Sequence, residues 1–231
     1  MLGAMPRELR PLARALGLRP ATVGGRAGWR GAHIVLGVVG VGTRSSGASC
    51  ARILDQLQPS RVVVVGLAGA VDSDLSIADV IAPASVVHAT TGATYTPHAR
   101  TEDAPFSDGA GDAAVGRPRR RILVTVDRFG DALPDGASAV DMETAAIAAE
   151  CERRDIPWDV RRAISDLPGT LHATVVSVLG SDGRPDPLAV ARLLARDPRQ
   201  AAVLVRLARD SSRAVGAVTR LVAAGLRGTP G

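Results

Sequence analysis

The chain of 231 residues contains neither lysine nor asparagine, so all 28 of its basic residues are arginine. Lysine and asparagine codons are rich in A and T, so a GC-rich genome explains this bias without any binding partner. The net charge of +5 and the pI near 10.7 are therefore weak evidence for nucleic-acid binding. The one dense basic run, at residues 117–121, has no interleaved aromatic side chains that could stack on bases. We expect no nucleic-acid partner.

Other residue types and patterns are also scarce. The two cysteines, Cys50 and Cys151, are too few for a disulfide framework, and Cys151 shares an apolar helix face with Ile147, so both are expected in the core.

No apolar run approaches the roughly 18–20 residues that span a bilayer. The N-terminus lacks the apolar segment of a signal peptide. We expect a cytoplasmic protein without stable membrane insertion. The four histidines lack metal-ligand spacing, so no metal or cofactor is expected.

Short β-branched runs alternate with helical patterns along the chain. This alternation predicts a single α/β domain over residues 1–231, with three α/β/α layers and a mainly parallel mixed sheet. Strands are expected at residues 32–39, 61–66, 79–87, 121–126 and 158–164, and helices at about 44–57, 143–154, 188–196 and 199–226. Residues 90–116 and 167–184 lack periodicity and are predicted as loops, the first of them a lid.

Two acidic residues follow predicted strands. Asp166 would stand at the carboxyl end of a strand, where open α/β sheets bind ligands. Burial there would raise its pKa, so that it could protonate a leaving heterocyclic base near neutral pH, although a loop or N-cap role is also open. Glu143 begins a helix. It either caps that helix or accepts hydrogen bonds from sugar hydroxyls, with Met142 offering an apolar surface to the sugar.

A third acid, Glu8, follows a glycine turn near the N-terminus. It is either the first acid of a short helix or a general base for a water molecule. Carboxyl groups on opposite sides of a sugar carbon, one acid and one base, are the arrangement that inverting glycoside cleavage requires. The three acids together predict an enzyme.

Four short motifs occur in a distinctive order: GAMPRE at residues 3–8, GLAGA at 66–70, VDME at 140–143 and RAISD at 162–166. Together they resemble the nucleoside phosphorylase/nucleosidase superfamily, and within it the methylthioadenosine/S-adenosylhomocysteine nucleosidases. The resemblance covers residues 3 to about 167. The turn at 183–186 and the arginine-rich closing helices are more similar to hopanoid-associated phosphorylases.

The resemblance implies a nucleoside-phosphorylase-like fold and specific roles for named residues. It implies that Glu8 activates the attacking water and that Asp166 protonates purine N7. The other positions that it implies in substrate binding are Met142 and Glu143 at the ribose, Phe129 at the base, and Asp141, Ser165, Ala68 and Gly69. The implied reaction is hydrolytic release of adenine from a 5′-substituted adenine nucleoside, by a homodimer.

Some positions depart from the family pattern, and other functions remain open. Leu67 replaces the usual hydroxyl residue of the glycine turn, Ala70 replaces a glycine, and Asp141 stands where many relatives carry Glu. Only two residues precede Gly3. Phosphorolysis is an alternative, with Arg44 at the start of a helix as a possible phosphate ligand. A non-catalytic nucleoside-binding module is another. The 5′ group could be methylthio, homocysteinyl or a lipid such as hopane.

Overall fold

The central strand of the sheet is apolar on both of its faces. In the computed structural model, which describes residues 1–98, 121–169 and 186–227, strand β5 (Val62–Ala70) opens with four consecutive valines. Val62 and Val64 belong to one apolar cluster, whereas Val63 and Val65 belong to a second cluster. Such a run, buried on both faces, is typical of a strand between two layers of helices.

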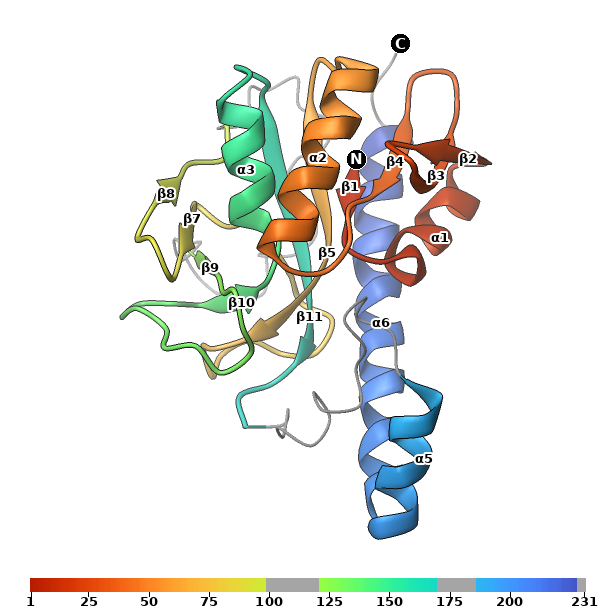
Figure 1. The fold of residues 1–231 in the computed structure, drawn as a ribbon, viewed down its shortest axis with the longest axis vertical. Helices are drawn as coiled ribbons and strands as arrows, with labels where there is room; N and C mark the ends of the chain where they lie inside the picture. The colour runs from red at the N-terminus through yellow and green to blue at the C-terminus, as the bar shows by residue number, and fades with distance from the viewer. Residues whose placement is uncertain (99–120, 170–185, 228–231) are drawn as a thin grey trace.

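Helices cover both faces of the sheet (Figure 1). Helices α2 (Thr43–Leu57) and α3 (Thr144–Glu152) contribute Ile53 and Ile147 to the first cluster. Helices α1 (Pro6–Ala15) and α6 (Gln200–Arg227) contribute Leu12 and Val218 to the second cluster, and α5 (Pro187–Arg196) packs on α6. The predicted three-layer α/β fold is confirmed.

The sheet is mixed. Its order in the described residues is β2-β3-β4-β1-β5-β10-β9-β7-β8, with β11 paired to β5 and β6 paired to β11. Strands β4, β1, β5 and β11 are parallel neighbours, and so are β10, β9 and β7, whereas β10 runs antiparallel to β5. Besides β5, the strands are β1 (Leu2–Gly3), β2 (Arg19–Val23), β3 (Arg26–Arg30), β4 (Val35–Val38), β6 (Val80–Ile81), β7 (Ser85–His88), β8 (Thr94–Tyr95), β9 (Ile122–Thr125), β10 (Ala139–Asp141) and β11 (Trp158–Asp166).

This topology brings distant segments together. The carboxyl ends of β5 and β11 lie side by side, with Ile164 opposite Ala68. Strand β10 pairs Val140 with Gly69 and runs back along β5, so the residues that follow it lead toward Gly66. The start of α1 follows β1, which also pairs with β5. The motifs of the sequence therefore converge on the carboxyl half of β5.

The prediction of one strand at residues 79–87 is wrong. That segment forms two short strands, of which β6 pairs with β11 and β7 pairs with β9. Pro83 lies between them and has no N–H to donate to a sheet. Strands β1, β2, β3 and β8 were not predicted. A short helix at Glu8 was one of two open interpretations, and a strand end was expected before Glu143; α1 and β10 match these two. Most of the predicted loops at 90–116 and 167–184, and the predicted lid with them, lie outside the described residues.

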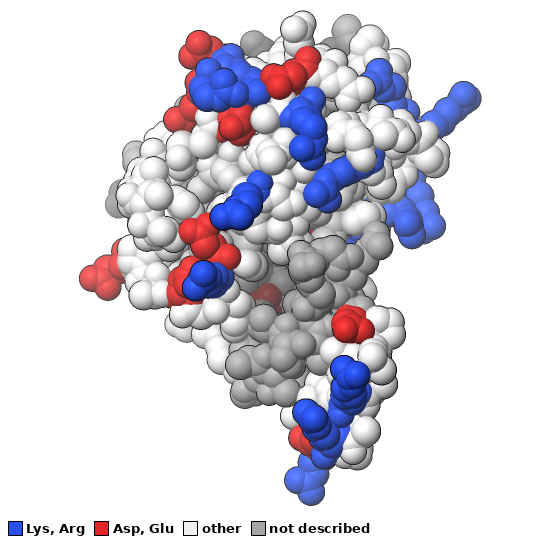
Figure 2. All heavy atoms as spheres, in the orientation of Figure 1, with Lys and Arg blue, Asp and Glu red and all other residues white. Residues whose placement is uncertain are grey.

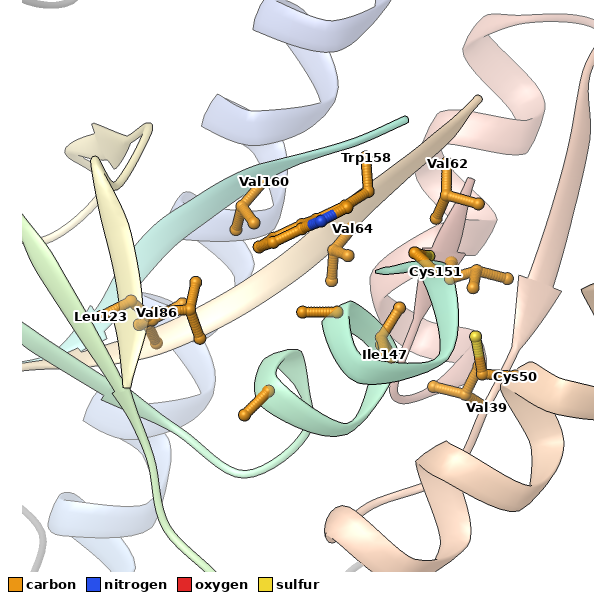
Figure 3. Packing of buried hydrophobic residues seen from close by; sticks show 14 of the residues in the cluster. Val39, Cys50, Val62, Val64, Val86, Leu123, Ile147, Cys151, Trp158 and Val160 are labelled. Carbon is orange, nitrogen blue, oxygen red and sulfur yellow. The ribbon is translucent and has the colours of Figure 1, made fainter. Parts of the chain in front are cut away.

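The core contains both cysteines (Figure 3). Cys50 on α2 and Cys151 on α3 are fully buried and free, beside Ile147 and Trp158 in the same cluster. The prediction of two small core residues is confirmed. In the part of the chain that the structure describes, none of the helices combines the length and the apolar character that crossing a membrane demands.

Candidate active site

The glycines of β5 leave space for charged side chains from neighbouring segments. A Cβ atom at Gly66 would overlap the guanidinium of Arg162 and lie 2.8 Å from Oε2 of Glu8. A Cβ atom at Gly69 would lie 2.5 Å from Oδ2 of Asp166. Gly66 and Gly69 therefore leave openings on β5, over which the side chains of Arg162, Glu8 and Asp166 gather.

Arg162 is the buried centre of this group. Its side chain is 1% exposed, and its Nη2 donates to Oδ2 of Asp141 at 2.5 Å and to Oγ1 of Thr144 at 2.8 Å. The same Nη2 lies 3.6 Å from Oε2 of Glu143. Although burial opposes it, the nearby carboxylates of Asp141, Glu143 and Glu8 raise the pKa of Arg162. The guanidinium is thus a fixed positive charge among three carboxyl groups.

Arg162 was not predicted as a site residue, although the sequence carries a signal for it. An arginine lies within the apolar strand segment at residues 158–164, and a guanidinium is almost never buried there unless it is paired. Glu8 and Glu143, which were predicted for the same edge of the sheet, are two of its partners.

Asp141 has a structural role in the cluster. It accepts hydrogen bonds from Oγ1 of Thr125 at 2.7 Å and from the backbone N–H of Thr144 at 3.2 Å, and the Thr144 hydroxyl also donates to it. It therefore caps the first turn of α3 as well as holding Arg162. Its oxygens are occupied by protein groups.

Glu143 does not cap α3 through its side chain. Its Oε1 accepts a hydrogen bond of 3.2 Å from the backbone N–H of Gly42, whose φ of 86° is one that glycine adopts readily. Burial raises the pKa of Glu143 to about 7, with Arg162 opposing the rise and Asp141 and Glu8 adding to it. The carboxyl group is therefore directed into the cluster.

Glu8 lies in the first turn of α1 and is 3% exposed. Burial raises its pKa, and the charges of Arg162 and Arg7 oppose that rise. Its Oε2, which lies over Gly66, is fully buried and has no hydrogen-bond partner among the described residues. Such an oxygen is free to accept a proton or a hydrogen bond from a bound molecule.

Asp166 is positioned by an irregularity in β11. The register shifts between Ile164 and Asp166, so that Asp166 lies opposite Gly69, and such bulges often redirect side chains beside active sites. Burial raises the pKa of Asp166, while the Ser165 hydroxyl, which donates to Oδ1 at 2.6 Å, opposes the rise.

Comparison with known proteins identifies the family. A sequence model described as the Phosphorylase superfamily matches residues 1–182. The chain belongs to this superfamily. A 5′-methylthioadenosine/S-adenosylhomocysteine nucleosidase of Anoxybacillus flavithermus is 27% identical over 203 residues, covering 73% of this chain and 85% of the relative. The prediction of an enzyme is thereby confirmed.

Solved structures of similar proteins share the fold of this phosphorylase-superfamily chain. One is the Neisseria meningitidis 5′-methylthioadenosine/S-adenosylhomocysteine nucleosidase in complex with methylthio-immucillin-A. It has a TM-score of 0.68 and 19% identity, covering 98% of this chain and 96% of that one. Another is the futalosine hydrolase of Helicobacter pylori, with a TM-score of 0.69 and 16% identity over 98% and 95% of the two chains. The hopanoid-like character of the closing helices remains a prediction.

The other residues that the superfamily resemblance implicated differ in burial. Met142 is half-buried and packs against the small apolar cluster of Val124 and Val126. Ala68 is buried, and its carbonyl accepts a hydrogen bond of 3.4 Å from the Ser165 hydroxyl. Phe129 is 46% exposed on the segment after β9, so its stacking on a base stays a prediction.

Asp127 joins three segments near Phe129 and was not predicted from the sequence. Its carboxylate accepts hydrogen bonds from the Thr43 hydroxyl at the start of α2 and from the Thr90 hydroxyl at 2.6 Å, and it lies 3.3 Å from Nε2 of His88. The hydroxyls of Thr43 and Thr90, followed by His88, lower the pKa of Asp127 to about 2. This contact fixes the turn whose Gly42 N–H binds Glu143.

Proposed function

We propose that this chain is a nucleosidase that hydrolyses the N-glycosidic bond of a 5′-substituted adenine nucleoside and releases adenine. The observation that carries the proposal is the contrast between two buried carboxyl groups. Glu8 lies beside the buried Arg162, whereas only a serine hydroxyl opposes the effect of burial on Asp166 among the described residues. Carboxyl groups held in different environments suit the separate roles of base and acid.

In the proposed reaction, Asp166 is the general acid. Adenine leaves poorly as an anion, and a proton donated by Asp166 to N7 relieves the charge as the glycosidic bond breaks. Its raised pKa favours the protonated form that this step needs. The carboxyl group lies at the carboxyl end of β11 over Gly69, where a ligand can approach the edge of the sheet.

Glu8 is the proposed general base. Its Oε2, free of protein partners in the described residues, accepts a proton from the water that attacks C1′ of the ribose. Arg162 favours the ionised form of Glu8 before the reaction. As the ribose acquires oxocarbenium character, the Glu8 carboxylate stabilises the developing positive charge before it takes the proton from water.

Seven further residues complete the proposed site. Glu143 accepts hydrogen bonds from the ribose hydroxyls, and Met142 covers the sugar face. Phe129 stacks on the adenine ring when substrate is bound. Asp141 contributes by holding Arg162 and the start of α3, since its oxygens already have protein partners. Ser165, Ala68 and Gly69 shape the adenine end of the site around Asp166.

Water is the proposed acceptor in preference to phosphate. Leu67 provides no hydroxyl in the glycine turn and packs against the second apolar cluster. The Gly42 N–H, which precedes α2, is used by Glu143, and the Thr43 hydroxyl is used by Asp127. These contacts occupy donors at the start of α2 that an oxyanion beside Arg44 would need.

The nucleosidase names of the relatives favour a methylthio or homocysteinyl group at the 5′ position. A panel of methylthioadenosine, S-adenosylhomocysteine, adenosine and a 5′-alkyl adenosine tests this choice by adenine release. We expect methylthioadenosine to be cleaved and adenosine to be a poorer substrate. Binding of the panel without any adenine release would instead indicate a non-catalytic nucleoside-binding module.

Substitution of Asp166 by Asn tests the assignment of the acid. An amide cannot supply the proton for N7, so we expect adenine release to fall by roughly 10²–10⁴-fold. Circular dichroism and thermal unfolding of the variant establish that it is folded. A folded Asp166→Asn protein with wild-type turnover would remove Asp166 from the mechanism.

A further inference from the structure

Helix α5 and the first half of α6, through Arg213, form a helical hairpin that projects from the rest of the molecule (Figure 1). None of the residues of α5 is buried. On α6 the buried residues begin at Ala214, where the helix reaches the sheet. The hairpin also lies beyond residue 182, where the match to the superfamily ends. It is therefore a feature that the proposed reaction does not explain.

The two helices of the hairpin bury little of their apolar surface. Their facing sides carry half-buried aliphatic residues, which are Val190, Leu193, Leu194, Val203, Leu204 and Leu207. Their outer sides carry several alanines together with Leu188, which is 56% exposed, and Val205, which is 48% exposed. The outer surface of the hairpin is thus partly apolar and open to solvent.

The acidic residues of the hairpin are engaged within it. Asp186 accepts from the Leu188 N–H at 2.9 Å and caps α5. Asp197 accepts from the Arg199 N–H at 3.1 Å ahead of α6. Asp210 lies 3.7 Å from Nε of Arg206 and 3.9 Å from Nη1 of Arg213. The hairpin carries six arginines against these three aspartates, so its net charge is +3.

Four other arginines of the hairpin have no acidic partner within the described ranges: Arg192, Arg196, Arg199 and Arg209. All four are exposed, and Figure 2 shows arginine side chains gathered at this projecting end of the molecule. The hairpin therefore combines free positive charge with exposed aliphatic side chains.

We propose that the helical hairpin binds the surface of an anionic phospholipid bilayer. Exposed arginines are attracted to acidic headgroups, and aliphatic side chains such as Leu188 and Val205 can enter the boundary between headgroups and acyl chains. A nucleic acid would bind the arginines through its phosphates but would leave Leu188 and Val205 exposed to water, so these two side chains favour a bilayer. Each free arginine strengthens binding about fivefold, so the attachment is reversible and sensitive to salt.

Co-sedimentation with lipid vesicles tests the proposal. The full chain is mixed with vesicles of phosphatidylcholine alone or of phosphatidylcholine with phosphatidylglycerol, at low and high salt. We expect binding to the anionic vesicles, and a loss of that binding at high salt. The variant R192Q/R196Q/R199Q/R209Q should bind at least 100-fold more weakly. The variant L188S/V205S should bind about tenfold more weakly, because less apolar surface enters the bilayer.

The matched control is R10Q/R14Q/R19Q/R30Q, which removes the same number of charges from exposed positions on α1 and on the β2–β3 hairpin. It should keep most of the vesicle binding. An equal loss in both quadruple variants, or no binding of the unmodified chain to anionic vesicles, would overturn the proposal. Circular dichroism of each variant verifies the fold.

If the hairpin binds a nucleic acid or a second copy of the chain and not a bilayer, the experiments give different results. Tighter binding to a DNA duplex than to anionic vesicles in the same buffer would make the hairpin a nucleic-acid surface and overturn the proposal. If light scattering without vesicles gives the hairpin variants a different molar mass from the unmodified chain, the hairpin is a contact between two copies of the chain. That result would also overturn the proposal. Adenine release in vesicle-free buffer should be unchanged in these variants, so a failure of lipid binding and a failure of the proposed function are distinguishable.

Discussion

At the scale of single residues, the hydroxyl of Ser165 tunes the proposed acid. It donates to Oδ1 of Asp166 at 2.6 Å and thereby opposes the effect of burial on that pKa. A hydrogen bond to a carboxylate favours the ionised form, so its removal raises the pKa further. Because the proposed reaction uses protonated Asp166, activity is present below this raised pKa and is lost as the pH increases through it.

The variant Ser165→Ala should therefore remain active to higher pH. We expect the midpoint of the alkaline limb of kcat to move upward by about one pH unit. The measurement is adenine release from methylthioadenosine across the pH range. Ser212→Ala on α6, whose hydroxyl donates to the Ala208 carbonyl, is the control and should leave the limb in place. If the midpoint of the alkaline limb were unchanged or lower in Ser165→Ala, the assignment of Asp166 as the general acid would be contradicted.

Glu143 should affect stability in a pH-dependent way. Burial raises its pKa from 4.5 to about 7, so the folded protein binds this proton more tightly than the unfolded chain does. The stabilisation is present below pH 4.5 and is lost as the pH rises through 7. Glu143→Gln, which cannot ionise, should therefore be more stable than wild type at pH 8, by up to about 3 kcal/mol. Urea unfolding measures the difference in the free energy of unfolding between Glu143→Gln and the wild type. That difference should vanish near pH 4.

Glu150 provides a control in which loss of the carboxyl group changes stability at pH 8 in the opposite direction. Burial would raise its pKa, but Arg153 and Arg154 outweigh that effect and lower it. Its stabilisation is present above the ordinary glutamate pKa and is lost as the pH falls. Glu150→Gln should thus be less stable than wild type at pH 8. If both variants changed stability in the same direction at pH 8, the electrostatic account of Glu143 would be wrong.

At the scale of elements, strand β5 supports the site because two of its residues lack side chains. Gly69→Ala would place a Cβ atom 2.5 Å from Oδ2 of Asp166 and force that carboxyl group to move. Displacement of a catalytic group by about 1 Å can reduce the rate about 100-fold, and we expect a fall of at least that size in adenine release. Gly47→Ala in α2 is the control, since its nearest contact is an ordinary 3.6 Å to Ala146. A Gly69→Ala enzyme as active as Gly47→Ala would contradict this role of β5.

Elements with local signals were predictable from the sequence. Helices α5 and α6 follow Asp186-Pro187 and Asp197-Pro198, and their predicted starts lie within one residue of the structure. Strands β2 and β3 were missed because their arginines, together with Pro20 in β2 and Gly28 in β3, interrupt any alternating apolar pattern. Strands β2 and β3 pair with each other as a local hairpin, whereas β10 pairs Val140 with the distant Gly69.

The contrast between local signals and contacts of distant residues also applies to the candidate site. Asp166 and Glu143 could be placed from the sequence because each follows a strand or begins a helix. The burial of Arg162 was signalled by its position in an apolar strand, but its full set of partners was not, because Asp141, Glu143 and Glu8 reach it through the sheet order β1-β5-β10 and the β5–β11 pair. Asp127 likewise joins Thr43 and Thr90, 84 and 37 residues away.

At the scale of the whole molecule, we propose that the chain works as a homodimer. Only 2% of its residues are aromatic, and Phe129 is 46% exposed, so an enclosed adenine pocket needs further covering surface. Multi-angle light scattering should give twice the 23.7 kDa mass of one chain at assay concentrations. A monomer with full activity at those concentrations would contradict this proposal.

The sugar product tests the central claim of hydrolysis most directly. Methylthioadenosine is cleaved with and without phosphate, and the sugar is identified by mass spectrometry for the wild type and for Glu8→Gln. Hydrolysis predicts free 5-methylthioribose at a rate that phosphate does not change, and a loss of roughly 10²–10⁴-fold in Glu8→Gln, because an amide cannot take a proton from water. A sugar 1-phosphate that forms only when phosphate is present, with much of the rate kept in Glu8→Gln, would contradict the account.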